Sequence, residues 1–325
     1  LTETTLQFNR DCASWLDVWA FQDLPSATLA KKENPPDDTG AHPLSAALAL
    51  YRGEFLEGFS VDSAPLEQWI LATRAQTHQR LLQILRWLAV EQEQWGDLEA
   101  ASLKRLQMFV LRSKVKLASL TESHLLLGLA GPQAAAALGD AGLPCPGAPL
   151  TSAISTEASV IGLEANRYVV AVKQEAIVEL WRKLAFKARP AGLPAWRWLD
   201  VQAGFPLVTA ATKEEFVPQM ADFEKLGGIS FHKGCYPGQE IVARTQYLGK
   251  VKRHLYRVRS DQLLEAGASL HSPDNPDQAC GMIVSGAPSP TGGYEALAVV
   301  QSNFAGNLHL GSREGPKIEA VAVNP

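Results

Sequence analysis

The sequence predicts an α+β protein with an all-α first part, a partial α+β domain and a small antiparallel β-barrel at the end. Apolar residues recur with helical period before residue 103, strands and helices alternate from 104 to 245, and short strands broken by Gly, Pro, Asn and Asp follow. A chain of 325 residues is long enough for several domains. We therefore expect domains at 1–103, 104–245 and 246–325.

The first part is predicted to be a helical, tetratricopeptide-like module. From Leu66 to Leu88 apolar residues repeat at the spacing of one helix face. Gly96-Asp97 is the predicted helix end and next N-cap, with a second helix starting at Leu98. Two antiparallel helices joined by such a turn are typical of one tetratricopeptide unit.

The second part is predicted to mix strands and helices. Expected strands lie at 115–117 and 125–130, and a hairpin joins 158–163 to 168–172. Gly131-Pro132 is expected to open a helix that ends at Leu138, and a second helix is expected over 174–187. The predicted barrel strands are 251–259, 280–285, 297–301 and 320–323.

Charge separates the same parts. Residues 1–103 carry 7 Lys and Arg against 15 Asp and Glu, whereas residues 104–325 carry 23 against 19. This asymmetry indicates two units with different partners. A net charge of −4 makes the whole chain a poor general ligand for nucleic acid, so we expect no direct nucleic-acid binding.

Composition excludes several other classes of protein. No apolar run approaches the ~20 residues of a membrane span, so we expect no membrane association. The four cysteines are far apart and form no Cys-X-X-Cys, which argues against a disulfide scaffold or a metal site and suits a reducing cytoplasm. The chain opens without Met or a signal-like segment, from which we expect a processed or truncated start.

Reactive chemistry is predicted in the glycine-rich segment from Phe216 to Arg244. Cys235 precedes an expected helix that begins at Pro237, and Lys233 lies two residues before it. A helix N-terminus and a nearby cation both favour thiolate over thiol, so Cys235 is the cysteine with a physical reason to react. The alternative is a small buried cysteine in a glycine-rich turn.

Two groups of motifs resemble known families. Phe8-Asn9-Arg10-Asp11, Tyr51-Arg52-Gly53-Glu54-Phe55-Leu56 and Glu67-Gln68-Trp69 resemble the bacterial transcriptional activator domain, over about residues 1–101. Lys233-Gly234-Cys235-Tyr236 followed by Gly238-Gln239-Glu240 resembles the signature of the YgfZ-type folate-binding proteins, over about 104–325. These are relatives of the glycine-cleavage T-protein, an aminomethyltransferase. Supporting matches are Ala203-Gly204-Phe205-Pro206, Phe216-Val217-Pro218-Gln219 and the run from Leu226 to Phe231.

The second resemblance implies a tetrahydrofolate-type ligand and a role in maintaining iron–sulfur proteins, including enzymes that modify transfer RNA. It implies Cys235 and Lys233 as reactive residues. The implied folate-binding residues are Trp196, Gly234, Tyr236, Gly238, Gln239 and Glu240. Trp196 matches a folate-contacting tryptophan, and its alternative is a half-buried core aromatic with Trp198 as competitor. Gln239 and Glu240 could instead cap the glycine loop or favour the helix dipole.

Other functions remain open from the sequence. The family's first domain has no counterpart here and an acidic helical segment stands in its place, which indicates a fusion. The alternatives to an accessory protein are a folate-dependent aminomethyltransferase and a regulatory interaction module built on residues 1–101. Six cations between Arg244 and Arg259 could meet folate carboxylates or RNA phosphates, or could form a solvated strand face.

Overall fold

The computed structural model describes residues 64–90, 93–108, 110, 114–164, 166–231, 233, 236, 238–247, 249 and 251–323. Their contacts divide them into two units. The sheet unit contains helix α4 (Ala64–Val90) and residues 120–192, and the barrel unit contains helix α5 (Glu93–Gln107) and residues 193–323. The predicted domain limits remain predictions.

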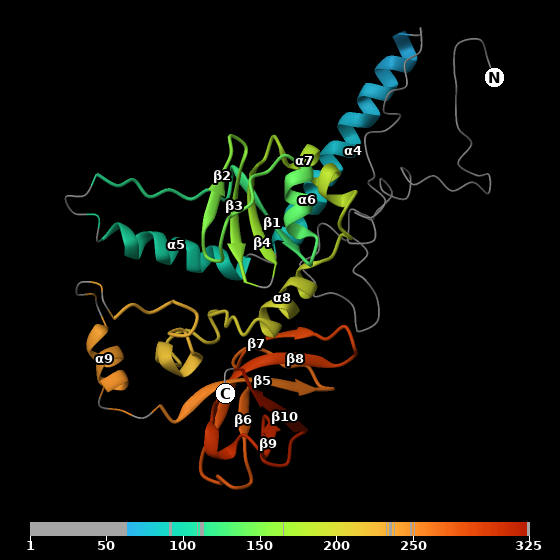
Figure 1. Cartoon of the computed structure of the whole chain (residues 1–325). Coiled ribbons are helices and arrows are strands. Elements are labelled where there is room, and N and C mark those ends of the chain that lie inside the picture. Colours follow the sequence, from blue (N-terminus) through green and yellow to red (C-terminus); the bar gives the residue numbers. More distant parts are fainter. Residues whose placement is uncertain are drawn as a thin grey trace, which may run out of the picture. The chain divides into compact units, whose positions relative to one another are not determined.

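The sheet unit is built on a four-stranded antiparallel sheet in the order β1-β4-β3-β2 (Figure 1). Its strands are β1 (His124–Ala130), β2 (Ser152–Ile154), β3 (Ala158–Leu163) and β4 (Arg167–Lys173). The predicted hairpin is confirmed as β3–β4, with Val160 opposite Val170. Asn166 in the turn has a left-handed backbone, with φ +55°, and the two strands that it joins form the centre of the sheet.

Helices α6 (Ala134–Asp140) and α7 (Ile177–Ala185) pack their apolar sides on the sheet. Ile177, Leu180 and Leu184 of α7 are buried and Trp181 is half-buried, as the helical period predicts. Leu81 of α4 joins this core and is fully buried. The opposite sheet face leaves Leu126, Ile154 and Ile161 exposed.

The barrel unit closes six antiparallel strands in the order β10-β5-β8-β7-β6-β9, which confirms the predicted barrel (Figure 1). The strands are β5 (Arg253–Ser260), β6 (Ser269–His271), β7 (Gly281–Pro288), β8 (Tyr294–Gln301), β9 (Leu308–Leu310) and β10 (Lys317–Ala322). A 3-10 turn, η2 (Ser302–Phe304), follows β8. The barrel core includes fully buried Leu270, Ile283 and Leu308.

Strand β8 is buried on both faces. Ala296, Ala298 and Val300 belong to the barrel core, whereas Leu297 and Val299 belong to a second cluster on the other side. That second cluster contains Val201 of helix α8 (Leu193–Gln202) and Ala221 of the 3-10 helix η1 (Pro218–Ala221). A strand covered on both faces has no polar alternation, which explains the continuous apolar run.

Two predicted elements are wrong. Residues 114–120 form no strand, and Val115 is exposed, because an isolated run of three residues has no pairing partner among the described residues. Gly96 and Asp97 lie inside α5 rather than between two helices. A glycine in a helix interior costs only about 1 kcal/mol, which the surrounding helix formers offset.

Other predicted elements shift or were not foreseen. The alanine-rich helix starts at Ala134, three residues late, because Gly131 has a φ of +123° that no helix accommodates. Helix α9 (Gln239–Tyr247) confirms the helix expected after the glycine-rich segment. The three-residue strands β2, β6 and β9 and helix α8 were not predicted. No helix in the described part of the chain is both long and apolar enough to span a bilayer.

Replacing a buried leucine of the barrel should cost far more than replacing an exposed one. Leu270 is 0% exposed and Leu263 is 54% exposed. We expect Leu270→Ala to lower the free energy of unfolding by about 2–5 kcal/mol through lost burial and a residual cavity. Leu263→Ala, the matched control, should change it by less than about 0.5 kcal/mol. Urea unfolding measures both, and equal losses would contradict this assignment of the core.

Candidate functional site

Part of the predicted site lies outside the described residues. Gly234 and Cys235 belong there, as does Pro237, but the helix start predicted at Pro237 is two residues early, because Gly238 has a φ of +87° and α9 begins at Gln239. The reactivity of Cys235 therefore remains a prediction. The structure describes the other residues of the motif, which are Lys233, Tyr236, Gly238, Gln239 and Glu240.

Gln239 caps its own helix. The Tyr236 backbone N–H donates to Gln239 Oε1 at 3.1 Å, and the Gln239 N–H donates to the Tyr236 carbonyl at 3.2 Å. This reciprocal pair resembles a capping box, in which a side chain three residues on satisfies a backbone donor. Gly238 between them has a φ of +87°, which favours glycine at this position of the motif.

Two ring contacts order the motif. Lys233 Nζ lies 4.4 Å from the centre of the Tyr236 ring, in cation–π geometry. Phe231 and Tyr247 meet edge to face with ring centres 6.5 Å apart, so the start of the segment contacts the end of α9. Glu240 is exposed in the first turn of α9, where its carboxylate favours the helix dipole.

Gln219 attaches α9 to η1. This side chain is 1% exposed, and its Nε2 donates to the Val242 carbonyl at 2.7 Å. Its Oε1 is buried and accepts no hydrogen bond from any described residue. A buried amide with one unused acceptor usually has a further polar partner, such as water or a ligand.

Asp222 is a second buried acceptor at the end of η1. Its backbone is left-handed, with φ +55°, and its side chain is 2% exposed. Lys225 Nζ lies 3.5 Å from Oδ2 and His254 Nδ1 lies 3.6 Å from Oδ1, but neither carboxylate oxygen receives a hydrogen bond from the described residues. His254 Nε2 lies 3.1 Å from the Val251 carbonyl, so the imidazole connects η1 with the approach to β5.

Helix α8 carries the predicted platform Trp196, which is half-buried, as is Trp198. Glu295 of β8 accepts hydrogen bonds from Gln202 at the end of α8 and from Ser289 Oγ, the latter at 2.7 Å. The Arg257 guanidinium donates to the Gln202 carbonyl at 2.8 Å. These contacts fix the C-terminal end of α8 on the barrel.

Glu295 is the carboxylate whose ionisation this arrangement most affects. Burial by itself raises its pKa, but hydrogen bonds from Ser289 and Gln202, the nearby Trp198 N–H and the charge of Arg259 outweigh burial and lower the pKa. The Trp198 N–H is close enough to favour the carboxylate, yet it does not reach good hydrogen-bond geometry and remains buried without a full partner among the described residues.

Gly204 closes α8 within the motif Ala203-Gly204-Phe205-Pro206. Its φ is +67°, and a Cβ at this position would collide with the side chain of Val323. Only glycine lets the chain turn here and lets the end of the barrel sequence pack against it. Packing and backbone conformation therefore explain the glycine at position 204 without a ligand.

Two of the six cations in the run from 244 to 259 are used within the fold. Arg257 binds the end of α8, and Arg259 donates to Thr291 Oγ1 and the Gly292 carbonyl at 3.3 Å. Arg244 is exposed, and Lys250 lies outside the described residues. Strand-face contacts therefore account for these two arginines.

The two described cysteines lie away from the motif. Cys145 is exposed, and its Sγ lies 3.7 Å from the Tyr168 hydroxyl, which raises the pKa of Tyr168. Cys280 is buried in the barrel core, and burial raises the pKa of its thiol. Among the described residues no group of three His, Cys, Asp or Glu side chains could hold a metal ion.

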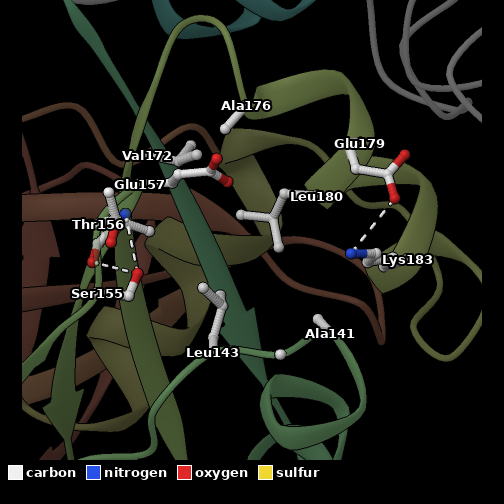
Figure 2. A pocket seen from close by; sticks show the side chains of 12 residues that line it. Ala141, Leu143, Ser155, Thr156, Glu157, Val172, Ala176, Glu179, Leu180 and Lys183 are labelled. Atoms are coloured by element: carbon white, nitrogen blue, oxygen red, sulfur yellow. Dashed lines mark hydrogen bonds and ion pairs between the residues drawn. The ribbon is translucent and has the colours of Figure 1, made fainter.

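A separate cavity of about 360 Å³ lies in the sheet unit (Figure 2). Leu143, Val172 and Leu180 form apolar walls, and Lys183 pairs with Glu179 at 3.3 Å on one side. None of the residues predicted from the sequence lines this cavity.

The described residues of the barrel unit suit a pterin in chemical type. A pterin presents several N–H donors and a carbonyl acceptor on a flat ring. Two side chains have buried acceptor oxygens that receive no hydrogen bond from described residues: Gln219 Oε1 and both carboxylate oxygens of Asp222. Two buried donors, Trp198 Nε1 and Arg257 Nε, likewise have no acceptor among the described residues. The sequence motifs contained Gln219, but no local pattern identified it, Asp222 or Glu295 as buried polar residues.

Stability should depend on pH through Glu295. Folding lowers the pKa of Glu295 below the ordinary carboxyl value of about 4.3. The ionised side chain therefore stabilises the fold above that pH, and this stabilisation is lost as the pH falls through the lowered pKa. Glu295→Gln should therefore flatten the acid-side decline of the urea midpoint. Exposed Glu319→Gln is the control. A decline unchanged in Glu295→Gln would contradict the role of these hydrogen bonds.

Comparisons with known proteins confirm both sequence resemblances. The model of the bacterial transcriptional activator domain matches residues 16–123, which end directly before β1. The tRNA-modifying protein YgfZ of Yersinia enterocolitica is 33% identical over 217 residues, covering 63% of this chain and 64% of that protein. The same-named protein of Cronobacter sakazakii is 38% identical over 169 residues, covering 51% of this chain and 50% of that protein.

The chain thus spans 64% of the length of the Yersinia relative. The solved aminomethyltransferase T of the glycine cleavage system from Bartonella henselae superimposes with a TM-score of 0.51 at 21% identity, over 70% of this chain and 64% of that one. This likeness shows the fold. The chain is therefore similar to the YgfZ-type proteins in sequence and to the glycine-cleavage T-protein in fold, with a segment similar to the bacterial transcriptional activator domain before β1.

Proposed function

We propose that this chain is a folate-binding accessory protein of the YgfZ type that supports iron–sulfur-dependent modification of transfer RNA. The observation that carries the proposal is 33% identity over 217 residues to proteins named for tRNA modification. The Lys233 to Glu240 signature adds to it. Iron–sulfur proteins and tRNA-modifying enzymes would be the partners, in the cytoplasm.

Tetrahydrofolate or a related folate is the proposed ligand, and it would supply a reduced pterin able to carry a one-carbon unit. The indole of Trp196 would stack on the pterin, an arrangement that adds about 0.5–1.5 kcal/mol beyond burial. The unused Gln219 Oε1 and the Asp222 carboxylate would accept pterin N–H groups. Tyr236, Gly238 and the Gln239 cap would shape the motif around the ligand, with Gly234 and Glu240 as further contacts.

Cys235 is the proposed reactive residue, assisted by Lys233. It lies four residues before α9 in sequence, next to the capping residue Tyr236, and a nearby helix N-terminus favours the thiolate. The Lys233 ammonium, held over the Tyr236 ring, adds a positive charge two residues away. Both features support a nucleophilic or redox-active sulfur.

An interaction module is the second candidate, favoured by the match of residues 16–123 to the bacterial transcriptional activator domain. In this function the helical segment would recruit a protein partner. Folate-dependent aminomethyl transfer remains an alternative, to which the aminomethyltransferase likeness contributes the fold alone.

Folate binding should be visible in tryptophan fluorescence. We expect a reduced folate to quench the emission of the wild-type chain and expect Trp196→Ala to lose most of that quenching, because the stacking surface is removed. Trp69→Ala, which removes a half-exposed tryptophan of α4, is the matched control. Absence of quenching in the wild type at any accessible folate concentration would count against the proposed ligand.

The sulfur of Cys235 should be essential for function and unimportant for folding. Cys235→Ser keeps the approximate volume but removes the polarisable, acidic thiol. We expect this variant to retain the wild-type melting temperature and to lose complementation of a strain that lacks its YgfZ relative and is deficient in tRNA thiolation. The intact relative serves as the positive control. Full complementation by Cys235→Ser would refute the role.

A further inference from the structure

The C-terminal end of α7 presents an aromatic ring to solvent among positive charges. Phe186, the residue that follows α7, is 85% exposed, although Ile177, Leu180 and Leu184 of α7 are buried. Four cations surround it in sequence: Arg182, Lys183, Lys187 and Arg189. We call these five residues the Phe186 patch. All of them belong to the sheet unit.

The backbone holds Phe186 outward. The Lys187 and Ala188 N–H groups both donate to the Leu184 carbonyl, at 3.0 and 2.8 Å. Leu184 and Ala188 pack into the core of the sheet unit, on either side of Phe186. The ring therefore projects from an ordered turn, so little conformational entropy would be lost when a partner contacts it.

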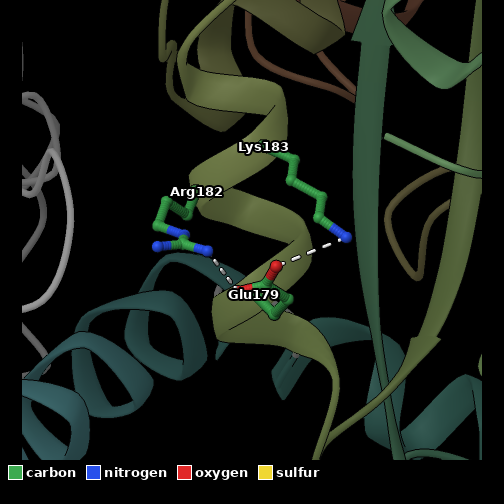
Figure 3. A network of polar contacts seen from close by, with 3 residues as sticks. All are labelled: Glu179, Arg182 and Lys183. Atoms are coloured by element: carbon green, nitrogen blue, oxygen red, sulfur yellow. Dashed lines mark hydrogen bonds and ion pairs between the residues drawn. The ribbon is translucent and has the colours of Figure 1, made fainter. Parts of the chain in front are cut away.

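Three of the four cations of the patch form ion pairs with described carboxylates. Glu179 lies between Arg182, at 2.9 Å, and Lys183, at 3.3 Å (Figure 3). Lys187 Nζ lies 3.3 Å from Asp140 and 6.0 Å from the centre of the Phe186 ring. A helix C-terminus attracts cations, which accounts for Arg182 and Lys183, but Lys187 and Arg189 lie beyond the helix.

The local charge differs from that of the whole chain. No Asp or Glu occurs between residues 180 and 199, a stretch that contains five Lys and Arg, although the chain carries a net charge of −4. The low net charge predicts weak general affinity for nucleic acid, and this segment is a local exception. Cations beside an exposed aromatic ring are the combination that binds phosphates and stacks on unpaired bases.

We propose that the Phe186 patch binds single-stranded nucleic acid, with one unpaired base stacked on Phe186 and adjacent phosphates on Arg182, Lys187 and Arg189. A double helix hides the faces of its bases, so the exposed ring selects an unpaired strand. The binding needs neither folate nor Cys235, and it is therefore separable from the function proposed above.

Fluorescence anisotropy with labelled 12-nucleotide RNA and DNA strands tests the proposal on the full chain. Loss of one stacked base is worth about 1–3 kcal/mol, so Phe186→Ala should raise Kd about tenfold, whereas Phe186→Trp should retain the affinity. Arg189→Ala should reduce the slope of log K against log salt by about 0.7, as expected for one lost phosphate contact.

Two matched controls separate stacking and charge from general surface effects. Ile154→Ala removes another highly exposed apolar side chain, 75% exposed on β2, and Lys173→Ala removes an exposed cation before α7. Both should bind like the wild type. A tenfold loss confined to Phe186→Ala, on RNA or on DNA, supports the proposal.

Three results would overturn it. The first is equal Kd values for the wild type and Phe186→Ala while both keep the same melting temperature. The second is affinity for blunt duplex RNA equal to that for the single strand. The third is binding of the chain to an acidic peptide or to phosphatidylglycerol vesicles, sensitive to Phe186→Ala, with no binding to either strand.

Discussion

The burial of strand β8 on both of its faces is the constraint on which the barrel unit depends. One face fills the barrel, and Leu297 and Val299 on the other face receive α8 and η1. Each Å² of apolar surface that this layer removes from water stabilises the unit by about 25 cal/mol. The layer also fixes two elements that carry polar residues, since Gln202 ends α8 and Gln219 lies in η1. Packing between elements far apart in sequence thus determines where the polar groups of the candidate site lie.

From that layer the positions of the motif residues follow by a short chain of contacts. η1 contacts β5, Gln219 of η1 binds the Val242 carbonyl of α9, and the first turn of α9 is capped by Gln239. The segment with Lys233 and Tyr236 is therefore held at its helical end by polar groups rather than by a large apolar contact.

The sequence predicted elements whose pattern is local and failed where long-range packing decides. The hairpin β3–β4, helix α7 and the apolar run of β8 all have periods or lengths that can be read directly. Strands β2, β6 and β9 have three residues each, too few to show a period. The Gln202–Glu295 contact joins residues 93 positions apart, and the burial of Gln219 and Asp222 depends on β5 and α9. No window of sequence contains those partners.

The charge of the whole chain and the charge around Phe186 also differ. The net charge of −4 is the sum of an acidic first part and a mildly basic remainder, and neither the net charge of the chain nor that of a part describes a patch of five residues. Salt screens charges separated by more than about 10 Å at 0.1 M, so a ligand near Phe186 responds mainly to the cations beside it and to Glu179 and Asp140. Two of these cations lie beyond the helix end, where the dipole of α7 no longer explains them. The local arrangement of charge around an exposed ring, and not the composition of the chain, therefore decides which ligand this surface can hold.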